Sequence, residues 1–380
     1  MSISDDIAAD MIAWRHDFHR YPELGREERL TSGKIAKILE PLGMEVRTGL
    51  AETGVVATLH GRCGSGPAIG LRAEMDALPI VEQAAVPYRS QTPGVFHACG
   101  HDGHMAILLG AATALARAPE FKGTVHFIFQ PAEELLNGAG EMIAAGLFEQ
   151  FPCDEIYALH NAPSLGVGVV AVRTGPILAA CDDFTIVVKG RGVHAALPHL
   201  GADPIVAAAH LIVALQTVVS RSLDPTESGV VTIGMISGGT SPNVIPESVI
   251  LRGTFRSASV GARETIGRRI REICAGAAVA HDVSMEFTIE MGCPPTINAD
   301  EPTAALVRAA RAAGAHVLTE MPTLMGSEDF AAMLQARPGC YFLLGQQGEM
   351  IHHPAYVFDD AIMSLGAAIF INIVRDRLGN

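Results

Sequence analysis

The chain has 380 residues, 49% of them hydrophobic and 18% charged, and its formal net charge at pH 7 is −14. This length suits two domains, and the composition supports a sizeable buried core and excludes an intrinsically disordered chain. The negative charge argues against a nucleic-acid partner, because the phosphate backbone attracts basic surfaces. It also gives no reason to expect binding to an anionic membrane.

Three further features indicate the compartment. The first six residues, MSISDD, contain two acids where a signal peptide begins with basic residues. No stretch of the sequence reaches the roughly 18–20 apolar residues of a membrane-spanning helix. The seven cysteines are scattered and form no CxxC pair, which is typical of a reducing environment with buried or ligating thiols. We therefore expect a cytoplasmic protein without a membrane partner.

The first 180 residues alternate strand-like apolar runs with helical patterns. This alternation predicts an α/β domain in which helices flank a mixed central sheet. The predicted strands are residues 54–59, 68–72, 124–130 and 156–160, and the predicted helices are residues 105–118 and 138–145.

The order of predicted strands and helices changes at Cys181. An arrangement like that of the first 180 residues resumes at about residue 294. Between these points the order β-α-β-β-α-β predicts an inserted ferredoxin-like α+β domain over residues 181–293. The catalytic domain is then discontinuous, over residues 1–180 and 294–380. The exposed sheet edge of the insert offers a surface for a second copy, so we expect a homodimer that uses it. Its strands are predicted at 184–189, 229–236, 248–256 and 283–291 and its helices at 202–221 and 260–280, and helices over 304–313 and 365–375 follow.

Residues 97–104 have the sequence HACGHDGH, which packs three imidazoles, a thiol and a carboxylate into eight positions. Each of these groups needs a partner when buried, so packing alone does not explain their density. A borderline-soft divalent metal prefers this mixture of ligands. Further candidates follow in Glu133-Glu134, in His160 and in His352-His353. The sequence therefore predicts a metal site.

Glu133 and Glu134 follow the predicted strand 124–130, which Pro131 ends. They should lie at the carboxyl edge of the sheet, where α/β proteins bind ligands. Adjacent carboxylates beside a metal allow one to coordinate while the other acts as general base. Asp76 and Asp102 are carboxylates able to accept the free N–H of a ligating imidazole. His16 and His19, by contrast, are predicted to lie on a polar helix surface.

At this point the sequence resembles the amidohydrolase branch of the M20-type metallopeptidases, which contains hippurate hydrolases, N-acyl-amino-acid amidohydrolases and auxin-conjugate hydrolases. The resemblance runs nearly from end to end, and Glu74 stands where this branch more often has Asp. The motifs that carry it are RHDFH at 15–19, PELG at 22–25, RAEMDALP at 72–79, the 97–104 cluster, QPAEE at 130–134, GVHAA at 192–196, GGTSPNVIP at 238–246, GSEDF at 326–330 and the region 352–354.

The resemblance implies the roles of individual residues. His352 is chosen over His353 because the family histidine stands two residues before the proline. His194 would stabilise the oxyanion, often from the partner subunit, and Asn243 would lie near the substrate. Asp76 would be a catalytic residue together with His194 and Glu133, and Glu133 would be the general base. The implied ligands of a two-metal site are Cys99, His101, Glu134, His160 and His352.

These features together predict a homodimeric metal-dependent amidohydrolase that cleaves the amide bond of N-acyl-L-amino acids. Zn²⁺ and Mn²⁺ both suit the mixed ligand set, and so do Co²⁺ and Ni²⁺. Three alternatives stay open: a dipeptidase or aminopeptidase of the same fold, a thiol hydrolase with Cys99 as nucleophile, and a non-catalytic metal-binding relative.

Overall fold

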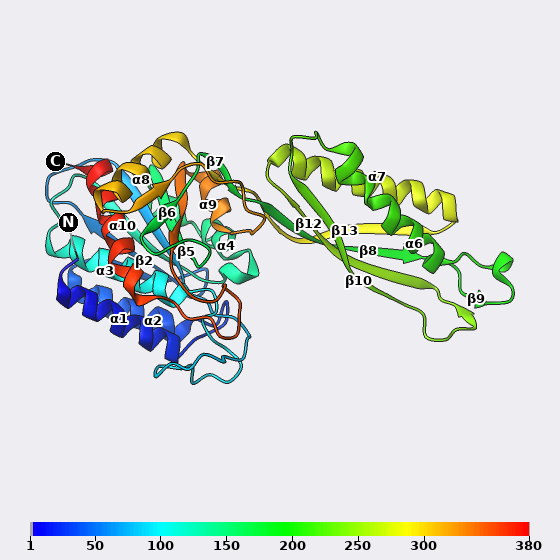
Figure 1. The fold of residues 1–380 in the computed structure, drawn as a ribbon, viewed down its shortest axis with the longest axis horizontal. Coiled ribbons are helices and arrows are strands. Elements are labelled where there is room, and N and C mark those ends of the chain that lie inside the picture. Colours follow the sequence, from blue (N-terminus) through cyan, green and yellow to red (C-terminus); the bar gives the residue numbers. More distant parts are fainter. Residues whose placement is uncertain (1–2, 380) are drawn as a thin grey trace. The chain divides into compact units, whose positions relative to one another are not determined.

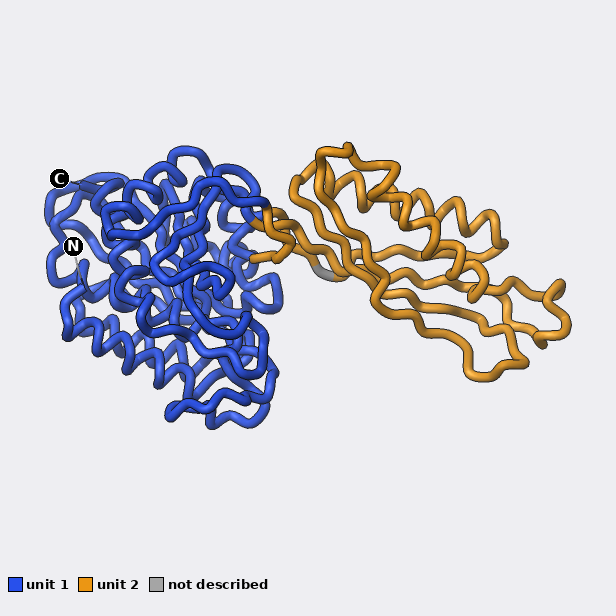
Figure 2. The backbone as a smooth tube through the Cα atoms, in the orientation of Figure 1, with its two compact units in different colours: residues 1–177, 296–322, 329–380 blue, residues 178–295, 323–328 orange. Residues whose placement is uncertain are grey.

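The computed structural model describes residues 3–379, and the chain forms two compact units in it (Figure 2). The first unit contains residues 3–177, 296–322 and 329–379, so it is assembled from three separate stretches of chain. The second unit contains residues 178–295 and 323–328. No helix in the described residues combines the length and the apolar character needed to cross a membrane.

An eight-stranded mixed sheet forms the centre of the first unit, in the order β1-β2-β4-β3-β5-β16-β6-β15. Strands β2, β5 and β6 of this sheet are labelled in Figure 1. The four middle strands of the sheet, β4, β3, β5 and β16, run parallel to one another. They are buried along most of their length, as expected for parallel strands covered on both faces. The strands are β1 (Glu45–Leu50), β2 (Gly54–His60), β3 (Ala68–Glu74), β4 (Thr124–Gln130), β5 (Glu155–Ala162), β6 (Val169–Ala171), β15 (His316–Leu318) and β16 (Gly339–Gly345).

Helices pack against this sheet in two groups. One group consists of α1 (Asp5–Arg20), α2 (Arg29–Leu39), α3 (His101–Arg117), α8 (Asp300–Ala312) and α10 (Met363–Leu378), and it shares the main apolar core with the strands. The other group consists of α4 (Gly138–Ala144), α5 (Leu147–Gln150) and α9 (Phe330–Ala336). The short strands β7 (Gly175–Leu178) and β14 (Thr296–Asn298) pair with each other.

The second unit has the predicted β-α-β-β-α-β order, and its antiparallel sheet has the strand order β10-β12-β8-β13. Two helices cover one face of this sheet and enclose a second apolar core. The predicted α/β fold with a ferredoxin-like insert is therefore confirmed. The elements are β8 (Ala180–Lys189), β9 (Val193–His194), α6 (Pro204–Leu215), β10 (Gly229–Gly238), β11 (Val244–Ile245), β12 (Ser248–Ser257), α7 (Val260–His281) and β13 (Ser284–Cys293).

The single helix predicted over residues 202–221 is wrong at both ends. Asp203 caps the N-terminus of α6, where its carboxylate accepts the backbone N–H groups of Ile205 and Val206. The α-helix ends at Leu215, and a wider π turn follows over Val218–Ser222. Side chains at this junction bond to nearby carbonyls, as Thr217 does to Ala214, and such bonds compete with the regular helix.

Helix α3 begins at His101, four residues before the predicted start. The prediction began at the first apolar residue, because the polar cluster 97–104 shows no helical hydrophobic pattern. Gly100 makes the earlier start possible with a φ of 98°. A Cβ atom there would lie 2.4 Å from the side-chain oxygen of Asn161, so only glycine fits. The cluster therefore straddles the N-terminus of a helix.

Candidate functional site

The candidate residues of the first unit gather at the carboxyl ends of the parallel strands. Asp76 follows β3, Glu133 and Glu134 follow β4, and His160 lies near the end of β5. The C-terminal segment joins them, because the backbone N–H of His352 donates to the carbonyl of Ala98 over 2.8 Å. This is the edge at which α/β sheets bind ligands, as the sequence predicted.

Six predicted side chains form one continuous cluster at this edge. Ligand atoms of Cys99, His101 and His160 all lie within 4.8 Å of one another. The same holds for Cys99, Glu134 and His352, and for His101, Glu133 and Glu134. Cys99 belongs to the first two groups, and its sulfur lies 3.2 Å from Nε2 of His160. Nε2 of His352 lies 3.4 Å from an oxygen of Glu134. The structure therefore brings the five predicted ligands and the predicted base together.

Backbone carbonyls fix how two of the imidazoles point. Nδ1 of His101 donates to the carbonyl of Asp76 and Nδ1 of His160 donates to that of Asn161, each over 2.8 Å. A neutral imidazole that donates from Nδ1 leaves the lone pair of Nε2 free to bind a metal. Nε2 of His101 is buried and has no hydrogen-bond partner among the described residues. The donor set therefore fits a divalent metal ion of the transition series.

Charge in this cluster opposes a nucleophilic role for the cysteine. Burial raises the pKa of the Cys99 thiol, and the carboxylates of Glu134, Glu133 and Glu74 raise it further. A nucleophilic cysteine needs the opposite shift, which a nearby positive group supplies. Burial lowers the pKa of His160, whose Nε2 contacts the sulfur, to about 3, so that imidazole is neutral. Burial also opposes a charge on His101, but the hydrogen bond to Asp76 and the nearby carboxylates raise its pKa to about 10. Even with this imidazole nearby, burial and the carboxylates keep the pKa of the thiol raised. A divalent cation would supply the positive charge that favours the thiolate.

Asp76 contacts two members of the cluster. Its carboxylate accepts the backbone N–H of Glu134 over 2.9 Å, and the other carboxylate oxygen lies 3.4 Å from Nδ1 of His101. The predicted bond from a ligating imidazole to the Asp76 carboxylate is not present, because the N–H of His101 donates to the backbone carbonyl of Asp76 and the nearby Oδ1 has no hydrogen-bond partner among the described residues. The same prediction fails for Asp102, because its carboxylate contacts His19 and Arg15 and no candidate ligand.

The prediction that His19 lies on a polar helix surface is wrong. His19 is fully buried and bonds to Asp102 over 2.8 Å and to Glu82 over 3.0 Å. Burial opposes its charge, but the hydrogen bonds to these two carboxylates raise the pKa to about 9. His16 is only half-buried and bonds to Asp360.

A signal for this burial was present in the sequence. The buried positions of α1 are Ile7, Met11, Arg15, Phe18 and His19, which follow the spacing of a single helical stripe. Arg15 and His19 therefore continue the apolar face of the helix.

Other buried polar residues, to which the sequence assigned no role, lie next to the cluster. His104 bonds through Nδ1 to Glu74 and through Nε2 to the side chain of Asn161, each over 2.8 Å. The Glu74 carboxylate also pairs with Arg72, which is fully buried. His97 is buried without a hydrogen-bond partner among the described residues, and burial lowers its pKa to about 3. Sequence reasoning did not single out Asn161, which follows a candidate ligand directly.

His194 and Asn243 belong to the second unit, where they lie close to each other. Strand β9 pairs with β11 so that His194 is opposite Val244, and the N–H of Ala195 donates to the carbonyl of Asn243 over 2.9 Å. Both side chains are exposed. Their predicted roles stay predictions.

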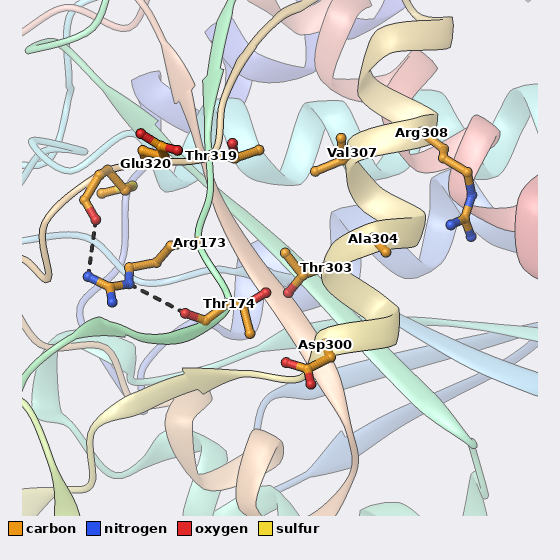
Figure 3. Close-up of a pocket in the computed structure, with 10 residues that line it drawn as sticks. Arg173, Thr174, Asp300, Thr303, Ala304, Val307, Arg308, Thr319 and Glu320 are labelled. Atoms are coloured by element: carbon orange, nitrogen blue, oxygen red, sulfur yellow. Dashed lines mark hydrogen bonds between the residues drawn. The ribbon is translucent and has the colours of Figure 1, made fainter.

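The first unit also contains a cavity of about 740 Å³ beside α8 (Figure 3). Arg173 lies in it and donates to the carbonyls of Thr174 and Met321 over 3.4 and 3.1 Å. The cavity contains none of the candidate site residues. Its lining residues are Arg173, Thr174, Asp300, Thr303, Ala304, Val307, Arg308, Thr319, Glu320 and Met321.

This chain is similar to known proteins over nearly its whole length. The model of peptidase family M20/M25/M40 matches residues 70–376. An N-acetyl-L-cysteine deacetylase of Bacillus subtilis is 42% identical over 371 residues, which cover 97% of this chain and 88% of the relative. A hippurate hydrolase of Campylobacter jejuni is 37% identical over 376 residues, which cover 98% of each protein.

A solved structure agrees with the same relationship. A Bacillus subtilis protein described as a dinuclear metal-binding peptidase from the M20 family superposes with a TM-score of 0.87 and 34% identity, covering 98% of both chains. The family match includes every candidate residue of the cluster, from Asp76 to His352. The chain therefore belongs to peptidase family M20/M25/M40.

Proposed function

We propose that this protein is a metal-dependent amidohydrolase that cleaves the amide bond of N-acyl-L-amino acids. The observation that carries the proposal is the cluster in which Cys99 belongs to two groups of ligand atoms and Glu133 lies beside them. Its members are buried except for Glu134, which is partly buried, and His352, which is exposed. The names of the relatives support the substrate class, because N-acetylcysteine and hippurate are both N-acyl amino acids.

The cluster suits two divalent ions. Cys99, His101 and His160 would hold one ion, and Cys99, Glu134 and His352 would hold the other. Zn²⁺ or Mn²⁺ is our first choice, and Co²⁺ and Ni²⁺ also suit sulfur, nitrogen and oxygen donors. When bound, such ions lower the pKa of a coordinated water and polarise the carbonyl that is attacked.

Glu133 is the proposed general base. Its carboxylate takes a proton from the attacking water and then passes that proton to the nitrogen of the departing amine. Asp76 holds His101 and Glu134 in place through the contacts described above. His194 would donate a hydrogen bond to the oxyanion that forms at the acyl carbon, and Asn243 would contact the substrate.

The alternatives have weaker support. The raised pKa of Cys99 opposes a thiol hydrolase, and the complete set of ligands and base opposes a non-catalytic relative. A dipeptidase would use the same residues, so only its substrates distinguish it from an amidohydrolase.

We propose that the active form is a cytoplasmic homodimer that takes a small-molecule substrate and binds neither nucleic acid nor membrane. The net charge of −14 supports the last two points. Residues 181–293 would form the dimerisation and lid domain, and residues 1–180 and 294–380 the catalytic domain. His194 would then act at the site of the partner subunit.

A substrate screen tests the proposed activity. Protein reconstituted with Zn²⁺ or Mn²⁺ should release the free amino acid from at least one N-acetyl-, N-benzoyl- or N-indoleacetyl-amino acid, and a chelator should abolish the release. Amine release is measured by chromatography. Cleavage confined to dipeptides would contradict the amidohydrolase assignment in favour of a dipeptidase.

Glu133→Gln and Glu134→Gln should separate the roles of the two neighbouring carboxylates. Glu133→Gln should lower kcat by at least about 10²-fold and retain both metal ions, because an amide cannot take the proton but keeps the volume of the side chain. Glu134→Gln should lose metal. Metal analysis together with turnover measures both, and metal loss in Glu133→Gln alone would mean that the roles are reversed.

Mixed dimers test whether His194 acts across subunits. Glu133→Gln and His194→Ala are each expected to be inactive as homodimers. A heterodimer of the two contains one site with an intact base and an intact partner histidine, so activity should return on mixing. Absence of recovery after subunit exchange, verified by mass spectrometry, would refute action in trans.

A further inference from the structure

The backbone is strained directly before the proposed base. Ala132 has a φ of 55° and a ψ of 39°, which places a non-glycine residue in the left-handed region. A non-glycine residue in this region is strained and persists only where its surroundings fix it. Glu133 follows at once and begins a short 3₁₀ turn over Glu133–Leu135. The conformation of Ala132 therefore determines where the chain aims the Glu133 side chain.

A buried carboxylate bonds to this strained residue. Glu28, which directly precedes α2, has no exposed surface. One of its carboxylate oxygens accepts the backbone N–H of Ala132 over 2.9 Å, and the other accepts the hydroxyl of Thr53 over 2.8 Å. Burial raises the pKa of Glu28 above its ordinary value, although these two hydrogen bonds act in the opposite direction. Charged or neutral, the carboxyl group presents an acceptor to Ala132.

Close packing behind the turn leaves Ala132 little room to move. A Cβ atom at Gly25 would lie 3.1 Å from Cα of Ala132, and one at Gly54 would lie 3.3 Å from Cδ of Pro131. The carbonyl of Ala132 accepts the N–H of Gly138 over 3.2 Å. The segments that carry Glu28 and Thr53 therefore meet the turn at van der Waals distance.

The turn is held on its other side as well. The N–H of Glu134 donates to the carboxylate of Asp76 over 2.9 Å. The backbone N–H groups immediately before and after Glu133 thus both end on buried carboxylates from distant parts of the chain. Asp76 also contacts His101, whereas Glu28 contacts the turn and Thr53.

We propose that Glu28 is a positioning residue for Glu133. Its hydrogen bond to Ala132 keeps the backbone in the left-handed conformation that aims the base at the attacking water. This inference rests on the proposed role of Glu133 as general base. Glu28 touches neither the candidate ligands nor the reacting atoms in this scheme, so its loss should slow proton transfer and leave substrate and metal binding intact.

Glu28→Met tests this inference, because methionine fills nearly the same space without an acceptor. We expect kcat to fall about ten- to a hundredfold, with KM and metal content within about twofold of the wild type. Glu28→Gln keeps an amide oxygen that can accept from Ala132, so it should recover kcat to within about threefold of the wild type. A merely structural role would not separate kcat from KM and metal content in this way.

Glu155→Gln is the matched control. Glu155 accepts from Arg377 and from the hydroxyl of Tyr157 at the start of β5, in the same unit as Glu28. It lies five residues before His160 on an extended strand, about 16 Å away. This variant should lower the melting temperature and leave kcat within about twofold of the wild type.

Three results would overturn the inference: a kcat for Glu28→Met within about twofold of the wild type, a loss of kcat that parallels loss of metal, or a Glu28→Gln variant no better than Glu28→Met. If Glu28→Met does not fold, Thr53→Val replaces it. Removal of that hydroxyl frees the carboxylate, so kcat should fall about threefold at constant KM, and an unchanged kcat would refute the role of Glu28.

Failure of the general-base role itself would show differently. In that case Glu133→Gln would retain turnover whatever Glu28 does. An inactive Glu133→Gln beside a fully active Glu28→Met would refute the positioning role alone.

Discussion

Buried negative charge is the constraint on which the rest of this site depends. The thiol of Cys99 lies at an edge of the sheet with three carboxylates, Glu74, Glu133 and Glu134. Burial raises its pKa, and the charges of these carboxylates raise it further. Burying like charges together is costly unless a positive group compensates them. Arg72 pairs with Glu74. The two groups of ligand atoms described above, by contrast, share the sulfur of Cys99. Metal ions at the proposed positions would balance this charge and would also supply the chemistry of hydrolysis.

Hydrogen bonds from distant segments of the chain hold the residues of this site in place. Backbone carbonyls of Asp76 and Asn161 fix the two buried imidazoles, and carboxylates of Glu28 and Asp76 fix the turn that carries the base. Behind them, Asp102 ties the first turn of α3 to α1 through His19 and Arg15. Precise placement of ligands and base matters because small displacements of reacting groups slow catalysis strongly. The buried polar network therefore serves the proposed catalysis as well as the stability of the fold.

The sequence predicted the parts of this arrangement that local pattern determines. Strand β4 has its predicted bounds. Short motifs with unusual residue types indicated the metal candidates, the family resemblance assigned five of them as ligands and Glu133 as the base, and the structure brings these six residues together. It failed where partners come from far along the chain. His19 continues the buried stripe of α1 but was expected on a surface, because the carboxylates that satisfy its buried imidazole, Glu82 and Asp102, come near only in the tertiary structure. Glu28 escaped notice for the same reason, since its partner Ala132 lies 104 residues away.

X-ray diffraction measured on both sides of the zinc absorption edge, on crystals grown with Zn²⁺, tests the central claim most directly. We expect two anomalous peaks, each within bonding distance of the sulfur of Cys99. One peak should also contact His101 and His160, and the other Glu134 and His352. A single peak, or a peak held by Glu74 and His104 in place of Cys99, would contradict the proposed two-metal site.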